Sequence, residues 1–88
     1  NMPMDFETAR FNMVEQQIRP WEVLDQTVLD VCAKVPRERF VPEDYRQLAF
    51  SDTAIDIGHG QAMMPPKIEA RLLQALDVQR TDRVLEIG

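Results

Sequence analysis

The chain has 88 residues, enough for one small domain, and a net charge of −5 from 15 acidic and 10 basic residues. This acidic balance argues against nucleic acid or an anionic membrane surface as a partner. The sequence shows no apolar run long enough to span a bilayer and no signal-peptide pattern, so we expect a cytoplasmic protein. Cys32 is the only cysteine, which excludes an internal disulfide, and its apolar neighbours favour a buried thiol.

The first part of the chain predicts two helices that end at X-Pro steps. Residues 5–18 begin at Asp5, a good N-cap residue, and carry an apolar stripe before Arg19-Pro20. Residues 25–34 begin at a second N-cap candidate, Asp25, and stop before Pro36. The side chains expected to face inward from this second helix are Val28, Leu29 and Cys32.

A charged stretch bracketed by prolines, residues 36–42, follows the second helix. This stretch carries three charged side chains in a row, which predict a solvated turn: Arg37, Glu38 and Arg39. Residues 42–48 predict a short helix with proline in the first turn. The inner face of that helix is expected to carry Tyr45, Leu48 and Ala49.

The second part of the chain predicts short strands around one longer helix. Residues 54–57 alternate and predict a strand, and residues 58–61 predict a turn or loop. Residues 66–76 predict a helix with a wide apolar face, opened by the proline pair. Residues 83–87 predict a buried strand that leads into Gly88, as at the first turn of a Rossmann-like fold. The alternative for these last residues is the terminal strand of a complete small domain.

Four segments carry motifs of one known family in the same order and at matching distances. They are VEQQIR at 14–19, VPRERFVP at 35–42, IGHGQ at 57–61 and RVLEIG at 83–88. From about Phe11 to Gly88, the chain therefore resembles the protein-L-isoaspartate O-methyltransferase family. No single segment is diagnostic, and the combination carries the resemblance.

The resemblance implies an α/β fold of which this chain is the mostly helical N-terminal part. Residues 5–78 would form an N-terminal helical subdomain, and residues 79–88 would begin a Rossmann-like class I methyltransferase domain. Residues 1–4 are expected to be a tag remnant or a flexible N-terminus. The chain would end at the first glycine of the cofactor-binding motif, so we expect the 88 residues alone to be inactive.

The same resemblance implies methyl transfer from S-adenosylmethionine to a carboxylate of damaged protein, with isoaspartyl proteins or peptides as partners. Cofactor contacts are implied for Glu86 and Gly88. The substrate pocket is implied to include His59, Gln61, Ala62, Met63 and Met64. His59, which lies between two glycines, is also consistent with an exposed turn, and a metal site is not expected because other ligands are missing nearby.

Two positions depart from the family pattern. The family has threonine and serine where this chain has Ala62 and Met64, so no catalytic residue is assigned here. Loss of two hydroxyls puts isoaspartyl methylation in doubt. The alternatives are a related methyltransferase with another substrate, or a non-catalytic domain for binding or self-association. Self-association is expected through the unpaired edge of the strand at 83–87.

Overall fold

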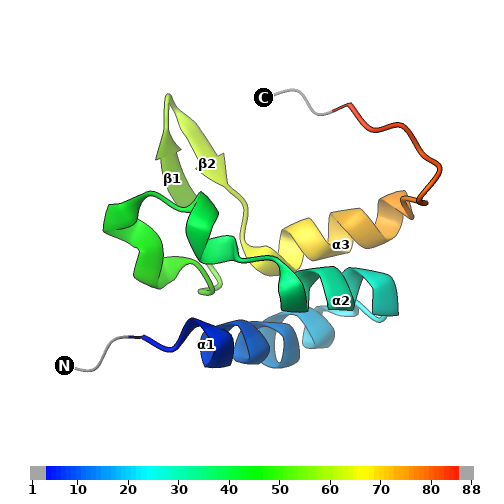
Figure 1. Ribbon diagram of the computed structural model, residues 1–88, viewed down its shortest axis with the longest axis horizontal. Helices are drawn as coiled ribbons and strands as arrows, with labels where there is room; N and C mark the ends of the chain where they lie inside the picture. Colours follow the sequence, from blue (N-terminus) through cyan, green and yellow to red (C-terminus); the bar gives the residue numbers. More distant parts are fainter. Residues whose placement is uncertain (1–3, 86–88) are drawn as a thin grey trace.

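The computed structural model describes residues 4–85 of the chain. This part is mostly helical, with one two-stranded antiparallel sheet. In Figure 1 the helices α1, α2 and α3 lie side by side, and the hairpin of β1 and β2 projects from one end of them. The bounds are α1 Phe6–Met13, α2 Gln26–Lys34, β1 Ile55–Gly58, β2 Gln61–Met63 and α3 Pro66–Leu76.

The first helical segment begins and ends much as its sequence predicts. The carboxylate of Asp5 accepts hydrogen bonds from the backbone N–H groups of Glu7 at 3.0 Å and Thr8 at 3.3 Å. Helix α1 continues into a π-helical turn, Val14–Ile18, and a short 3-10 turn, Arg19–Trp21. The helix predicted over residues 5–18 is therefore confirmed, although its second half is wound more widely than an α-helix.

Helix α2 confirms the second predicted N-cap. The carboxylate of Asp25 accepts from the backbone N–H groups of Thr27 at 2.9 Å and Val28 at 3.2 Å. Leu29 is buried, whereas Val28 and Cys32 are half-buried and pack against the core from its edge. The inward face predicted for this helix is thus correct, but two of its three side chains are less buried than expected.

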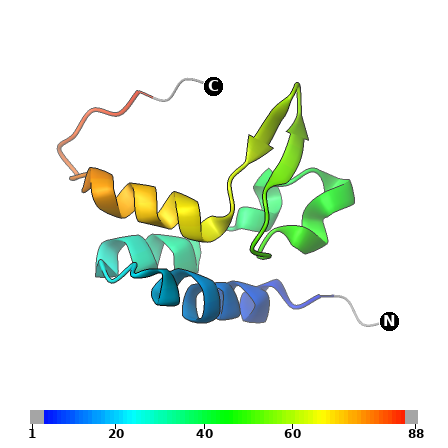
Figure 2. The same ribbon diagram turned by 180° about the vertical axis from the view of Figure 1, so that it is seen from behind.

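Two short 3-10 turns, Arg37–Phe40 and Glu43–Leu48, connect α2 to the hairpin. The view from behind in Figure 2 shows them beside the hairpin, at the same end of the helices. The second turn confirms a helical segment near residues 42–48 but not its predicted inner face. Ala49 is buried, while Tyr45 and Leu48 are exposed, because a 3-10 turn rotates successive side chains by a larger angle than an α-helix.

The hairpin contains a strand that was not predicted. β1 confirms the strand predicted near residues 54–57, and it pairs antiparallel with β2, so that Ile55 faces Met63 and Asp56 faces Ala62. The turn between them requires left-handed backbone at Gly58 (φ 90°), His59 (φ 57°) and Gly60 (φ 71°). Two glycines supply this conformation without steric cost, which explains why the chain reverses here.

The strand predicted over residues 83–87 is wrong for its described part. Helix α3 ends at Leu76 and is followed by its C-cap residue Asp77, which has left-handed backbone (φ 48°), and residues 83–85 are in no strand. Val84 and Leu85 are exposed. An extended segment needs a neighbouring strand for its backbone groups, and within residues 4–85 the two strands pair with each other. The rest of the predicted strand lies outside the described residues.

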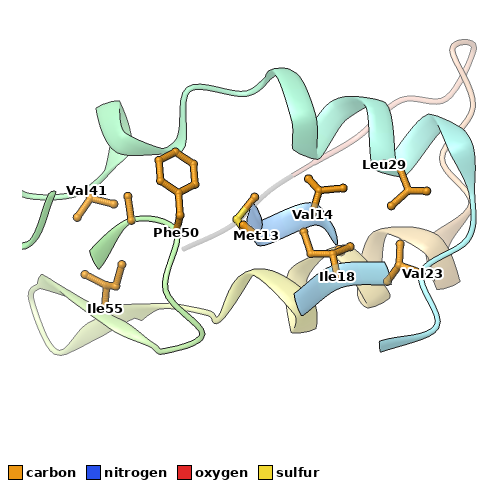
Figure 3. Packing of buried hydrophobic residues seen from close by; sticks show 10 residues of the cluster. Met13, Val14, Ile18, Val23, Leu29, Val41, Phe50 and Ile55 are labelled. Atoms are coloured by element: carbon orange, nitrogen blue, oxygen red, sulfur yellow. The ribbon is translucent and has the colours of Figure 1, made fainter. Parts of the chain in front are cut away.

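The core runs from the helices to the hairpin. Figure 3 shows Ile18 and Val23 between the helices, Phe50 and Ile55 towards the hairpin, and Met13 between these groups. Ile18 and Val23 are fully buried. Within residues 4–85, the hydrophobic residues of this buried cluster are Met13, Val14, Ile18, Val23, Leu29, Val41, Ala49, Phe50, Ile55 and Ala70.

A buried arginine connects α1 to the turn at residues 37–40. Arg10 donates to Glu38 at 2.9 Å and to Glu7 at 3.0 Å, and its guanidinium lies 5.3 Å from the centre of the Phe50 ring. Burial alone would raise the pKa of Glu38, but hydrogen bonds from its own backbone N–H and from Arg10 outweigh burial, so its pKa is lowered. Glu38 was predicted to lie in a solvated turn, and this prediction is wrong because Arg10 holds it inside.

Acid should therefore weaken the fold through Glu38. Because its pKa is lower in the folded state, its contribution is present above the ordinary value of about 4.3 and is lost as pH falls through the folded pKa. We expect Glu38→Gln to reduce the loss of thermal stability between about pH 6 and about pH 3. Glu7→Gln is the matched control, since Glu7 binds the same arginine but is 88% exposed. An acid response that is identical in wild type and Glu38→Gln would contradict this assignment.

Candidate functional site

A hollow of about 630 Å³ opens between the hairpin, the end of α2 and one face of α3. Four of the residues implied for a substrate pocket lie together on its wall: Gln61, Ala62, Met63 and Met64. Other lining residues include Met13, Ile18, Cys32, Arg37, Ile57, Glu69 and Leu73. The hollow is thus mostly apolar, as small-molecule and peptide side-chain sites commonly are.

The wall formed by residues 61–64 is positioned by the hairpin and by the start of α3. Strand β2 supplies Gln61 to Met63, and Met63 is half-buried opposite Ile55 of β1. Met64 follows the strand and precedes the proline pair that opens α3. Met64 is 44% exposed and is not part of the buried core. Neither Ala62 nor Met64 can donate a hydrogen bond from its side chain.

Arg37 is the residue of this site that sequence reasoning missed. It was predicted to lie in a solvated turn, but it is buried, and its guanidinium donates three hydrogen bonds. Nε donates to the Ala49 carbonyl at 2.6 Å, Nη1 to Glu69 Oε1 at 2.6 Å and Nη2 to the Met64 carbonyl at 2.8 Å. The prolines around it bracket the turn in the sequence, but the partners of Arg37 are 12 to 32 residues away and no local pattern identifies them.

His59 is not brought to the hollow. It occupies the tip of the hairpin turn, where it is exposed, and it is not among the residues that line the hollow. Within residues 4–85, no group of three or more His, Cys, Asp or Glu side chains is arranged to hold a metal ion.

The titratable groups of the hollow are neutralised or inert. Arg37 and Glu69 pair with each other at 2.6 Å. Burial raises the pKa of the Cys32 thiol, the nearby charge of Glu69 raises it further, and Arg37 only partly opposes this. The thiol therefore stays protonated near neutral pH and is a poor nucleophile. This arrangement suits the holding of an apolar group rather than acid–base chemistry.

Large apolar side chains at the mouth of the hollow remain open to solvent. We call these six residues the apolar rim: Val31, Val35, Phe40, Ile57, Met64 and Leu73. Each is at least 40% exposed, and they come from α2, the turn after it, the hairpin and α3. Several exposed apolar side chains around one hollow are typical of a contact with another segment or molecule.

Two implied contacts fall outside this description. Glu86 and Gly88, implied for the cofactor, lie outside the described residues.

Of the helices in residues 4–85, none has both the length and the apolar character needed to cross a membrane.

Comparison with known proteins identifies the family. Residues 8–88 match the family model of protein-L-isoaspartate(D-aspartate) O-methyltransferase. A protein-L-isoaspartate O-methyltransferase 2 from Anaeromyxobacter sp. (strain Fw109-5) is 46% identical over 82 residues, which are 93% of this chain and 34% of the relative. A protein-L-isoaspartate O-methyltransferase from Aeropyrum pernix is 43% identical over 83 residues, which are 94% of this chain and 32% of the relative. The chain thus spans about a third of the length of these curated relatives.

Proposed function

This chain belongs to the protein-L-isoaspartate(D-aspartate) O-methyltransferase family, and we propose that it is the N-terminal part of a methyltransferase of this family. The reaction would transfer a methyl group from S-adenosylmethionine to a carboxylate of an isoaspartyl residue in damaged protein. The observation that carries this proposal is the family match, which extends over residues 8–88 and includes all four motifs.

The proposed architecture follows from the same match. Residues 5–78 would form the helical subdomain, and residues 79–88 would lead into the Rossmann-like sheet supplied by the rest of the protein. The apolar rim supports this division, because a surface of that kind needs a covering segment. Within residues 4–85 the hollow offers S-adenosylmethionine no free carboxylate for its ribose, since Glu69 is paired with Arg37. We propose that cofactor binding falls to Glu86 and Gly88, which the family resemblance implies as cofactor contacts, together with the remaining polypeptide.

The hollow is proposed to hold the methyl acceptor. A carboxylate is already nucleophilic, so the residues around it need to orient it and exclude water more than move protons. The apolar wall at Ala62, Met63 and Met64 would perform both tasks for the apolar part of the acceptor. S-adenosylmethionine, when bound, supplies the activated methyl group.

A second candidate function rests on the departure at two wall residues. Ala62 and Met64 line the hollow where the resemblance implies threonine and serine, so two hydroxyls are absent there. A wall without hydroxyls favours an acceptor with an apolar group next to its carboxylate. A related carboxyl methyltransferase with such a substrate is therefore the second candidate.

The proposed partners are isoaspartyl proteins or peptides rather than nucleic acid or membrane surfaces. The net charge of −5 supports this choice, since anionic polymers and lipids would be repelled. We also propose that the protein acts in the cytoplasm. A single half-buried cysteine with no disulfide partner in the sequence is typical of reducing compartments.

Methyl transfer by the full-length protein tests the proposed function. We expect label from methyl-labelled S-adenosylmethionine to enter an isoaspartyl peptide as a base-labile ester, and not the same peptide with normal aspartate. The expected rate is low because Ala62 and Met64 supply no hydroxyl. Labelling of both peptides at the same rate would reject isoaspartyl specificity. Labelling of neither, with other carboxylates methylated, would favour the second candidate.

A further inference from the structure

Arg37 connects three segments that are distant in sequence and meet beside the hollow. Its three guanidinium nitrogens bind the carbonyl of Ala49, the carboxylate of Glu69 on α3, and the carbonyl of Met64. All three donor–acceptor distances are 2.8 Å or less, which is short for N–H···O bonds. The planar fork of a guanidinium holds such partners at fixed angles, which a lysine ammonium does not do.

The contact to Met64 is the one that concerns the site. Met64 joins β2 to α3, and its backbone has no strand partner to fix it, since β2 ends at Met63. The bond from Arg37 therefore supplies the restraint that the ladder no longer provides. Because the carbonyl is held, the position of the Met64 side chain on the wall of the hollow is also restricted.

We propose that Arg37 is a positioning residue for the methyl acceptor: it sets the wall at Ala62 to Met64 by clamping the Met64 carbonyl to α3. This inference rests on the proposed function, because the wall matters only if the acceptor occupies the hollow. Arg37 itself does not need to touch the acceptor. It acts through the backbone of the wall, with Glu69 balancing its charge.

Arg37→Lys in the full-length protein tests this role, because the KM for the acceptor and the KM for the cofactor should respond differently. We expect the KM for an isoaspartyl peptide to rise by about tenfold, as for a displaced positioning group, while the KM for S-adenosylmethionine stays unchanged. A purely structural role would lower kcat with the folded fraction and leave both KM values as in wild type. That second result would overturn the proposal. Glu69→Gln is the milder variant, and it should raise the same KM by a smaller factor because it keeps an acceptor oxygen.

Arg10→Lys is the matched control. Arg10 is the other buried arginine among the described residues, but it binds two carboxylates, those of Glu7 and Glu38, and not the Met64 carbonyl. The variant Arg10→Lys should lower thermal stability much as Arg37→Lys does, yet leave the acceptor KM unchanged. An equal rise of the acceptor KM in both variants would show that loss of stability, and not positioning, is being measured.

A signal from Met64 gives a readout that does not depend on activity. Its methyl resonance can be assigned by its disappearance in Met64→Leu. In Arg37→Lys we expect this resonance to shift or broaden while that of Met13, which is buried in the core, stays in place. In Arg10→Lys the Met64 resonance should be unchanged. If the wild type proves unable to methylate any isoaspartyl peptide, the proposed function fails, but an unmoved Met64 resonance in Arg37→Lys is what would refute the clamp.

Discussion

The double substitution Ala62→Thr with Met64→Ser is expected to raise kcat/KM for an isoaspartyl peptide by roughly tenfold in the full-length protein. Each restored hydroxyl can donate one hydrogen bond to a polar acceptor, and such bonds contribute about 0.5–1.5 kcal/mol each. Both side chains are exposed on the wall of the hollow, so neither substitution opens a cavity in the core. The fold should therefore tolerate the change, and the gain should appear in activity rather than in stability.

Steady-state kinetics with matched isoaspartyl and aspartyl peptides measures this effect. Met4→Ser with Ala33→Thr makes the same chemical changes at exposed positions that do not line the hollow. That control should leave kcat/KM at the wild-type value. If the wall variant gains nothing while remaining folded, the hydroxyls are irrelevant and a different acceptor becomes the better interpretation of the hollow.

The helices could be predicted from sequence because their boundaries are set locally. Asp5 and Asp25 are each followed within three residues by the backbone N–H groups that they accept from. A carboxylate that caps its own helix needs no distant partner, so residue type and spacing are sufficient. The apolar face of α3 is likewise a local property, and the helix predicted over 66–76 has the observed bounds.

The environment of the charged residues after α2 is made by distant segments, so it could not be predicted from the local sequence. Arg37 and Glu38 occupy one turn, yet their partners include residues of α1 and α3 and the residue that follows β2. Burial of a charge is favourable only when such partners converge, and the sequence of the turn does not contain that information. Residues 36–42 alone predict a solvated turn, because the partners that bury Arg37 and Glu38 lie outside this stretch.

The hairpin shows the same division between local and distant determinants. Its turn is local, because glycines on both sides of His59 permit left-handed backbone. Its second strand is only three residues long, too short for an alternating pattern, and forms because β1 lies beside it. The hairpin places Gln61 to Met64 on the wall of the hollow and leaves His59 at its tip. Because these residues are close in sequence, their spacing does not predict that His59 lies apart from the others.

The 88-residue chain on its own is expected to self-associate, with the apolar rim as the contact. The sequence predicts this contact at a strand over 83–87, but residues 83–85 form no strand edge. The rim instead presents six large apolar side chains that are at least 40% exposed, and burying them against a second copy removes that surface from water. We therefore expect dimers whose fraction rises with concentration. In the proposed full-length enzyme the rest of the polypeptide would cover the rim and suppress this association.

Sedimentation over a range of concentrations tests the contact. Phe40→Glu with Leu73→Glu introduces like charges into the rim and should leave the chain monomeric. Leu24→Glu is the matched control, because Leu24 is 74% exposed and does not line the hollow. That variant should associate like the wild type, since a single charge far from the contact changes little. Equal weakening by both variants would indicate an effect of net charge, and a wild-type chain that stays monomeric at high concentration would show that the rim alone does not hold two copies together.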